Sequence, residues 1–340
     1  MIAASEQELD ELLSRPNAAD REAMKRLDGP LVILGAGGKM GPTLARRASR
    51  AAEEGGAKRR VIAVSRYSSD TARRNLEQWG VETISADLLD REQLAMLPEA
   101  ANIIYMAARK FGSTGSEYLT WGMNAWLPGI VAERYRESRI VALSSGNIYP
   151  LLPVVSGGAT ESAPLSPVGE YAQSVLARER VFEFFSIRYG TPCVMVRLNY
   201  AAELRYGVLL DIGTAVFERR PVDLAMGNVN VIWQGDANSI ILRSGELASS
   251  PPAVLNLTGP ETLSVRYVAE RFGHHFGIDP QFNGKEGETA LLNNASKCQR
   301  LFGYPSVTPD EMIECTAQWI GMGGATHGKP TKFGVRDGKF

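Results

Sequence analysis

The sequence has few cysteines and histidines, and they are widely separated. Its 340 residues include 3 cysteines, Cys193, Cys298 and Cys315, and 3 histidines. No Cys or His spacing matches a zinc site, so we expect no metal centre. An odd number of distant cysteines is typical of a reduced protein, and we see no basic stretch followed by an apolar one near residue 1. We therefore expect a cytoplasmic protein.

The sequence also lacks an excess of charge of one sign and any long apolar run. Lys and Arg total 37 and Asp and Glu total 38, a net charge of −1. This balance predicts no nucleic-acid partner. No apolar run approaches the roughly 20 residues of a membrane span, so no membrane partner is expected either. A hydrophobic content of 44% indicates a globular chain.

Short apolar runs alternate with helical stretches over the first two thirds of the chain. Apolar runs occupy 30–34, 61–64, 81–85, 102–106, 140–143 and 193–198, and helical patterns occupy 42–52, 90–96, 118–136 and 170–189. Runs that are apolar on both faces are typical of parallel strands covered by helices. The pattern predicts an α/β fold with a doubly wound parallel, or Rossmann, sheet.

The same pattern predicts the domain boundaries. Residues 1–28 form an N-terminal helical arm, and 29–199 form a dinucleotide-binding Rossmann domain. The rhythm then becomes irregular, which predicts a smaller mixed α/β substrate lobe over 200–322, with 229–258 returning to the Rossmann domain. Residues 323–340 form a tail, either an extended strap or partly disordered, or else a contact with a partner subunit.

A glycine-rich turn follows the first apolar run and opens a helix. Its residues are Gly35, Gly37, Gly38, Lys39, Met40 and Gly41. Gly35 permits the tight turn, Gly38 lets the backbone approach a pyrophosphate, and Gly41 lets the helix pack close to the strand. The helix N-terminus then offers N–H donors to phosphate. We expect this loop to bind a dinucleotide.

The end of the second apolar run indicates which dinucleotide is preferred. NAD-binding chains usually place an acid there, but this run ends in Ser65 and Arg66. Both side chains suit a 2′-phosphate, and Lys39 adds positive charge nearby. We therefore expect NADP(H) to be favoured over NAD(H).

Several further stretches resemble the short-chain dehydrogenase/reductase superfamily, in its extended, NAD-dependent epimerase/dehydratase-like branch. They are the glycine loop, Ser85–Leu88, Ile104–Ala108, Asn124, Leu143–Tyr149 and Pro167–Tyr171. The resemblance implies that Asp87 and Leu88 touch adenine. It also implies that Met106, Ala107 and Ala108 line the nicotinamide side. Ser145 and Tyr171 take the catalytic positions, with Tyr171 also beside the cofactor.

One departure concerns the family pattern Tyr-x-x-x-Lys, in which Val175 stands where the lysine is expected. In the family this lysine holds the nicotinamide ribose and lowers the pKa of the tyrosine, which is otherwise near 10. Three interpretations follow. The site is dead for redox chemistry, or Arg109 or Lys110 supplies another cation, or Tyr171 acts as a neutral acid beside a different base.

The resemblance implies hydride transfer to or from a hydroxyl or carbonyl of a sugar-like or sugar-acid molecule, an enzyme of carbohydrate metabolism. Candidate substrate contacts are Arg109, Lys110, Ser113, Asn147, Asn199 and Arg205. The helices over 118–136 and 170–189 match the pair that forms a homodimer interface in the family. Two alternatives remain: a non-catalytic dinucleotide-binding sensor or scaffold, and a lyase or isomerase that uses transient oxidation.

Overall fold

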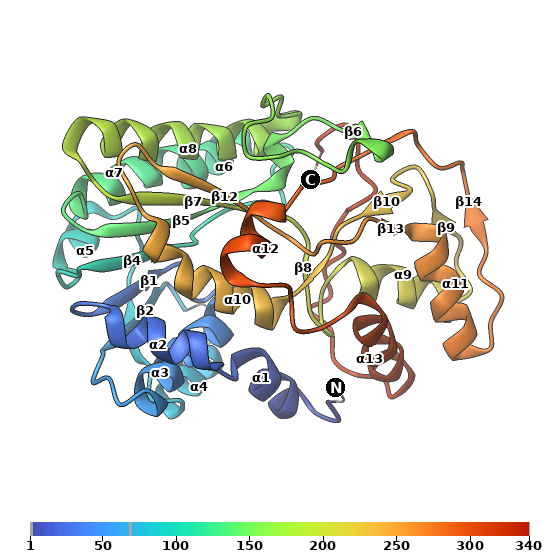
Figure 1. Ribbon diagram of the computed structural model, residues 1–340, viewed down its shortest axis with the longest axis horizontal. Helices are drawn as coiled ribbons and strands as arrows, with labels where there is room; N and C mark the ends of the chain where they lie inside the picture. The colour runs from blue at the N-terminus through green and yellow to red at the C-terminus, as the bar shows by residue number, and fades with distance from the viewer. Residues whose placement is uncertain (1–2, 68–69, 340) are drawn as a thin grey trace.

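The computed structural model describes residues 3–67 and 70–339. Seven parallel strands form its main sheet, in the order β12-β7-β5-β4-β1-β2-β3 (Figure 1). They are β1 (Leu31–Leu34), β2 (Val61–Ser65), β3 (Glu82–Ser85), β4 (Asn102–Tyr105), β5 (Arg139–Ser145), β7 (Cys193–Leu198) and β12 (Ala253–Leu257). The predicted Rossmann-type α/β fold is confirmed. The strand order reverses between β1 and β4, the place where doubly wound sheets bind ligands.

Helices cover both faces of this sheet because the strands are apolar on both sides. In β1, Leu31 and Ile33 join one buried cluster, and Val32 and Leu34 join another. The first cluster faces α3 (Gly41–Glu54), α4 (Asp70–Gln78), α10 (Gln234–Arg243) and α12 (Ser296–Phe302). The second faces α5 (Arg91–Met96), α7 (Leu127–Arg134) and α8 (Gly169–Tyr189). The sheet is thereby fixed as a rigid base for the loops at its carboxyl edge.

The helix predicted over 118–136 is present over 117–134, and its middle departs from the α-helical geometry that the pattern predicts. Helix α6 (Glu117–Trp121) leads into a π-helical turn at Gly122–Trp126, and α7 follows. The turn carries Asn124, which is fully buried and bonds to the backbone of Arg109. Inserted π turns of this kind often occur at functional sites, and here the turn fixes the loop after β4.

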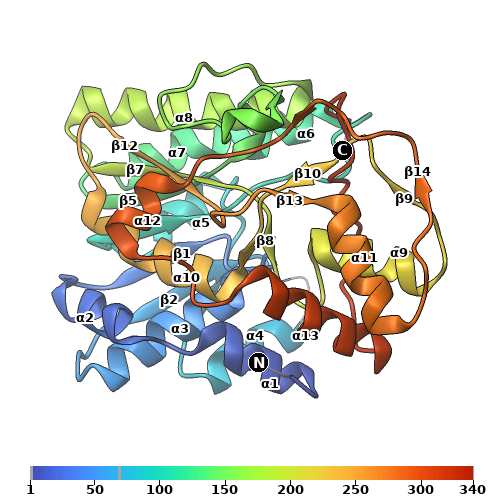
Figure 2. The same cartoon turned by 45° about the vertical axis from the view of Figure 1, so that its right-hand side comes forward.

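The second lobe packs three helices, α9 (Val208–Phe217), α11 (Val265–Phe276) and α13 (Pro309–Gly321), around its own apolar core (Figure 2). Short strand pairs edge it: β6 (Leu152–Pro153) with β15 (Thr289–Ala290), β8 (Ala201–Ala202) with β11 (Ile232–Trp233), β9 (Val222–Asp223) with β14 (Phe282–Asn283), and β10 (Asn228–Val229) with β13 (Leu263–Ser264). The strand predicted over 229–233 is therefore two short strands. Asn230, between them, bonds to Glu261 and Asn293 instead of extending a ladder.

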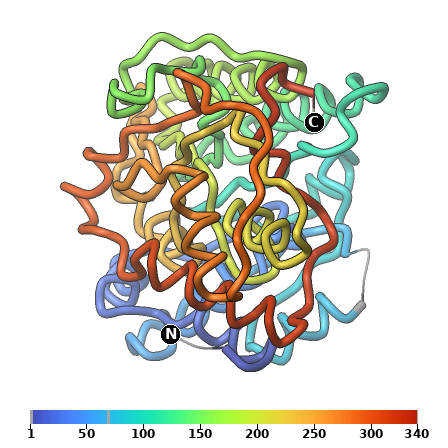
Figure 3. The backbone as a smooth tube through the Cα atoms, turned by 90° about the vertical axis from the view of Figure 1, so that its right-hand side faces the viewer, coloured from blue at the N-terminus to red at the C-terminus, as the bar shows by residue number. Residues whose placement is uncertain are grey.

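Both ends of the chain pack onto the body of the protein. Helices α1 (Glu6–Ser14) and α2 (Ala18–Arg26) lie against α3 and α10, and buried Asp20 pairs with Arg47 at 2.6 Å. Residues 325–339, here called the C-terminal strap, run back from α13 and end beside Gly169. The two termini lie at opposite ends of the view in Figure 3.

Two kinds of feature are missing from the described residues. Over 3–67 and 70–339, no helix is long and apolar enough to cross a membrane. In the same ranges, no group of three or more His, Cys, Asp or Glu side chains is arranged to hold a metal ion.

Candidate functional site

The glycine loop forms an open cradle between β1 and α3. Gly35 has φ +89°, and an added Cβ there would lie 2.6 Å from the backbone nitrogen of Ala107. At Gly41 an added Cβ would lie 2.2 Å from the carbonyl oxygen of Ala36. Larger residues would therefore push the helix away from the strand. The loop delivers backbone groups and the N-terminus of a 14-residue helix to one point at the sheet edge, which suits a phosphate.

A cavity of about 430 Å³ lies on the β2 side of this loop. Ser65, Arg66, Asp87 and Leu88 line it, together with Gly35, Gly37, Gly38, Met106, Ala107 and Ala108. The guanidinium of Arg66 is largely exposed, 4.0 Å from the Asp87 carboxylate. The structure thus brings together the residues predicted to hold adenosine, except Lys39.

Lys39 turns away from that cavity and across the loop toward the second lobe. Its Nζ donates a hydrogen bond to the carbonyl oxygen of Ala201 at 2.8 Å and lies 4.3 Å from the centre of the Tyr206 ring. Burial lowers the pKa of Lys39 to about 8, while Glu203 raises it. Its charge therefore reaches the opposite cleft and not the adenosine cavity.

A second cleft, of about 290 Å³, opens on the β4 and β5 side of the glycine loop. The site residues predicted from the sequence that line this cleft are Gly35, Gly38, Lys39, Met40, Met106, Ala108, Lys110, Ser145, Asn147, Tyr171 and Asn199. The clefts share Gly35, Gly38, Met106 and Ala108, so one elongated ligand can occupy both.

Ser145 and Tyr171 form the polar centre of this second cleft. Ser145 ends β5, Tyr171 lies in the first turn of α8, and both side chains line the cleft. Burial raises the pKa of Tyr171, and both the Arg178 guanidinium and the Ser145 hydroxyl lower it. Two hydroxyls from different elements therefore converge on one point, where they can hold a single oxygen atom of a ligand.

Val175, one turn after Tyr171, supplies no charge to the cleft. Its side chain is fully buried in an apolar cluster with Ile148, Tyr149 and Ala159. The position therefore serves packing.

The two cations that follow β4 have different surroundings. The backbone N–H and C=O of Arg109 both bond to the Asn124 side chain, and its guanidinium donates to the carbonyl of Gly112 at 3.0 Å. The next residue, Lys110, enters the cleft instead, with its Nζ 5.8 Å from the centre of the Tyr171 ring. Of this predicted pair, only Lys110 lines the cleft.

Burial lowers the pKa of Lys110 to about 8, because the ammonium loses contact with water. Asp211 of α9 raises it and Lys332 of the strap lowers it further. Ser113, another predicted substrate contact, donates its hydroxyl to the Lys110 carbonyl at 2.7 Å and accepts a bond from Thr120. Ser113 therefore shapes the loop that carries Lys110.

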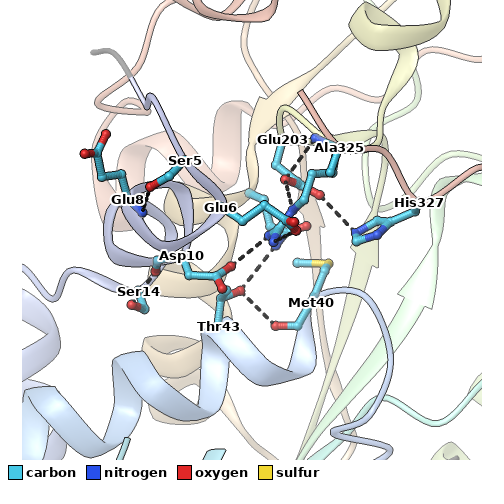
Figure 4. Close-up of polar contacts among 12 residues, drawn as sticks. Ser5, Glu6, Glu8, Asp10, Ser14, Met40, Thr43, Glu203, Ala325 and His327 are labelled. Carbon is cyan, nitrogen blue, oxygen red and sulfur yellow. Dashed lines mark hydrogen bonds and ion pairs between the residues drawn. The ribbon is translucent and has the colours of Figure 1, made fainter. Parts of the chain in front are cut away.

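Arg205 was predicted to contact substrate, but its guanidinium bonds to carboxylates outside the cleft. It pairs with Asp10 at 2.9 Å and with Glu203 at 3.1 Å. Figure 4 shows Asp10, Glu203 and His327 converging at this point, with His327 3.2 Å from Glu203. The arrangement joins α1, the second lobe and the C-terminal strap.

Three functional-site features escaped the sequence analysis. Thr331 of the strap is buried in the wall of the cleft that holds Tyr171. Arg178 donates to the Leu143 carbonyl and to Asn124 Oδ1, both at 2.8 Å, and so connects α8 to β5 and to the π turn. Glu179 accepts bonds from Arg197 and Ser144, which anchors the strand end that carries Ser145. Only Arg178 could have been found from the sequence. It follows Tyr171 by seven residues, and this spacing places both side chains on one face of a helix.

Comparison with known proteins agrees with this geometry. A model of the NAD dependent epimerase/dehydratase family matches residues 31–202. The chain belongs to this family. Membership confirms the predicted kind of enzyme, an epimerase/dehydratase-type oxidoreductase, and supports the coarser cofactor prediction of a nicotinamide dinucleotide. A comparison with curated protein sequences finds no match.

Solved structures share the fold at low sequence identity. UDP-glucose 4-epimerase from Thermotoga maritima, with UDP-glucose, is 16% identical with a TM-score of 0.69, over 86% of this chain and 98% of the epimerase. dTDP-glucose 4,6-dehydratase from Bacillus anthracis, in complex with NAD, is 16% identical with a TM-score of 0.72, over 86% and 97%. UDP-glucuronic acid 4-epimerase from Bacillus cereus, in complex with NAD, is 16% identical with a TM-score of 0.69, over 86% and 98%. They establish a common fold.

Proposed function

We propose that this chain is an NADP(H)-dependent oxidoreductase or epimerase that acts on a hydroxyl or carbonyl group of a compact sugar or sugar acid. The observation that carries the proposal is the pair of hydroxyls, Ser145 and Tyr171, that line one cleft beside the glycine loop. These hydroxyls can hold the reacting oxygen of a substrate at the edge of a dinucleotide-shaped double cleft.

The chain's residues fit a dinucleotide along the whole length of that cleft. Gly35, Gly37, Gly38 and the start of α3 suit the pyrophosphate, because an added Cβ at Gly35 or Gly37 would collide with neighbouring atoms. Asp87 and Leu88 flank the adenine side, and Met106, Ala107 and Ala108 the opposite side. When bound, the nicotinamide would accept or give a hydride.

NADP(H) is favoured because no acid stands at the end of β2. Ser65 and Arg66 line the adenosine cavity there, and the Arg66 guanidinium has room to turn toward a phosphate. A phosphate on the adenosine ribose can take charge-assisted hydrogen bonds from Arg66 and a hydroxyl bond from Ser65. An unmodified ribose would offer neither group a charged partner.

The substrate is compact because the C-terminal strap closes the cleft beyond the Ser145–Tyr171 pair. Past Asn147 and Tyr200, the space narrows to a pocket of about 40 Å³ walled by Lys332, Arg336 and Gly338 of the strap. Arg336 donates to the carbonyls of Ala225 and Thr289, which ties the strap to the second lobe. This pocket is too small for a nucleotide attached to the sugar. A free sugar or sugar acid does not need to enter this pocket.

We also propose that the active form is a homodimer. Helices α6 and α8 lie side by side and expose large apolar side chains: Tyr118, Phe184 and Ile187 are 75%, 58% and 60% exposed. Trp126, in the adjoining π turn, is 57% exposed. A second copy that packs through the same helices would cover these apolar side chains symmetrically. The three cysteines are buried and form no disulfide among the described residues, which favours a cytoplasmic, reducing environment.

Two other functions are compatible with the same cleft. A sensor or scaffold would bind the dinucleotide and convert no substrate. A lyase or isomerase would convert substrate with no net change in dinucleotide absorbance. The pair of hydroxyls from Ser145 and Tyr171 in one cleft favours catalysis over a scaffold, since a scaffold has no use for it.

The first test is calorimetric titration of stripped protein with NADP⁺ and, separately, with NAD⁺. Tight binding with NADP⁺ preferred supports the proposal, and screening of free sugars, sugar acids and UDP-glucose should follow. Absence of binding to either dinucleotide would overturn it.

A further inference from the structure

We propose that Lys110 is the proton-exchanging group of this site, with Tyr171 serving as a neutral hydrogen-bond donor to the reacting oxygen. The inference rests on the proposed function and deepens it. It assigns a residue to the proton transfer in a site where Val175 stands in place of the family's lysine.

The geometry places the Lys110 amine in the correct cleft. It lines the same cavity as Ser145 and Tyr171, with Nζ 5.8 Å from the Tyr171 ring centre. The loop that carries it is fixed on both sides, by Asn124 at the Arg109 backbone and by Ser113 at the Lys110 carbonyl. The amine and the two hydroxyls therefore line one cavity, in which a single substrate can contact all three.

The charged surroundings make Lys110 the better proton acceptor of the two. Burial raises the pKa of Tyr171, so the phenol keeps its proton at neutral pH and can only donate a hydrogen bond. Burial lowers the pKa of Lys110 to about 8, close to the neutral range in which a base works best. The charged groups that act on Lys110 are Asp211 from α9 and Lys332 from the strap, and Lys110 in turn lowers the pKa of Lys39.

Several other charged groups near the cleft are held by hydrogen bonds. Lys39 donates to the Ala201 carbonyl, Arg178 donates to Leu143 and Asn124, and Asp211 accepts two bonds from Thr331. No histidine among the described residues lines this cleft. Lys110 lines it together with Ser145 and Tyr171, and burial disfavours the charged form of its amine.

The step balances as follows when a substrate alcohol is oxidised. The C–H bond breaks and its hydride passes to the oxidised dinucleotide. The O–H bond breaks and its proton passes to the neutral Lys110 amine, while the carbon–oxygen double bond forms. Lys110 becomes an ammonium and then releases the proton to water. Reduction runs through the same atoms in reverse.

The first test measures the protonation of Lys110 without any substrate. Competitive acetylation of the full chain at a series of pH values, with and without NADP⁺, followed by peptide mapping, gives the titration of each lysine separately. The exposed Lys58 provides the reference reactivity in the same map. We expect Lys110 to titrate near pH 8. Titration within about one pH unit of the ordinary lysine value near 10.4 would overturn the proposal.

The second test uses whichever sugar or sugar acid the wild-type protein oxidises. Lys110→Met and Lys110→Arg should both lower the oxidation rate by about 100-fold or more, because neither side chain accepts a proton near neutral pH. Both should also abolish the rise in rate through about pH 8. If Lys110→Arg keeps most of the wild-type rate, the site needs only positive charge, and the assignment of Lys110 as base is wrong.

The two tests separate failure of this inference from failure of the proposed function. If the wild-type chain binds no dinucleotide or oxidises no substrate, the proposed function fails, whatever the acetylation shows. If turnover occurs and Tyr171→Phe abolishes it while Lys110→Met does not, the function stands and the role of Lys110 falls.

Discussion

Thr331 donates both its backbone N–H and its hydroxyl to one carboxylate oxygen of Asp211, with the backbone bond at 2.8 Å. Asp211 belongs to α9 of the second lobe, and Thr331 belongs to the C-terminal strap. Further along, the strap packs on Gly169, where an added Cβ would lie 2.4 Å from the Gly338 carbonyl oxygen. The strap thus ties the second lobe to the helix that carries Tyr171.

Deleting residues 329–340 should lengthen the substrate that the cleft accepts. The deletion removes Thr331, Lys332 and Arg336 from the cavity walls and opens the space past Asn147. We expect NADP⁺-loaded wild-type protein to show no calorimetric binding of UDP-glucose and the shortened chain to bind it. Arg336→Ala, which loosens the strap without removing it, is the matched variant. Tight UDP-glucose binding by the wild type would show that the strap does not select by length.

Tyr171→Phe should abolish turnover and leave NADP⁺ affinity nearly unchanged. The substitution removes the hydroxyl that shares the cleft with Ser145, while the buried ring keeps its packing. A loss of about 100-fold to 10,000-fold is typical when a group that handles the reacting proton or oxygen is removed. Rates and calorimetric affinities measured on the same preparation decide this. Unchanged turnover would remove Tyr171 from the mechanism.

Arg66→Ala should weaken NADP⁺ binding by about 10-fold to 150-fold, since a charge-assisted bond is worth about 1.5–3 kcal/mol, and leave NAD⁺ binding almost unaffected. The side chain is exposed and its neighbour Asp87 is 4.0 Å away, so the fold should tolerate the change. Arg60→Ala, an exposed arginine at the opposite end of β2, is the control. Equal weakening for both dinucleotides would mean that Arg66 covers adenine without discriminating the phosphate.

Lys110→Met should raise the free energy of unfolding at pH 7 by about 1–2 kcal/mol, because it removes a charged amine from a desolvated cleft. The folded pKa of Lys110 is about 8, below the unfolded value near 10.4. Between these values the unfolded chain binds more protons, so wild-type stability should rise with pH across that window. The rise should be smaller in Lys110→Met. Denaturant titrations at several pH values test this, with Lys58→Met as the exposed control.

Arg197→Met should lower the free energy of unfolding by about 3–5 kcal/mol, because it leaves the buried Glu179 carboxylate without its bidentate partner. Glu179 also accepts a bond from Ser144, the neighbour of Ser145. Arg60→Met breaks an exposed pair with Glu82 and should lower the free energy of unfolding far less, because water screens the pair. Similar losses in both variants would contradict a structural role for the buried pair.

The sheet and the glycine loop were predictable because their signals are local. The apolar run that ends at Leu34 and the glycines from Gly35 onward lie within a few residues of one another, and each has one physical interpretation. The placement of the Ser145 and Tyr171 hydroxyls on one cleft followed from the family resemblance.

The features of the site that could not be predicted depend on contacts between segments that are distant in the sequence. Arg109 and Lys110 are adjacent, and the backbone of the loop that carries them is held by bonds from Asn124, 15 residues away. The role of Thr331 depends on Asp211, 120 residues earlier. No periodicity or spacing in the sequence records such pairings. The π turn that positions Asn124 also departs from the single helix that the apolar pattern predicts.

The strap also separates the control of substrate length from the binding of the dinucleotide. Thr331, Lys332 and Arg336 wall the substrate cleft and its extension, and none of them lines the adenosine cavity. The strap is held by Asp211 and by the carbonyls of Ala225 and Thr289. A proteolytic cut between α13 and Thr331 would therefore open the substrate cleft and leave the glycine loop intact, so limited proteolysis can change substrate selection without changing affinity for NADP⁺.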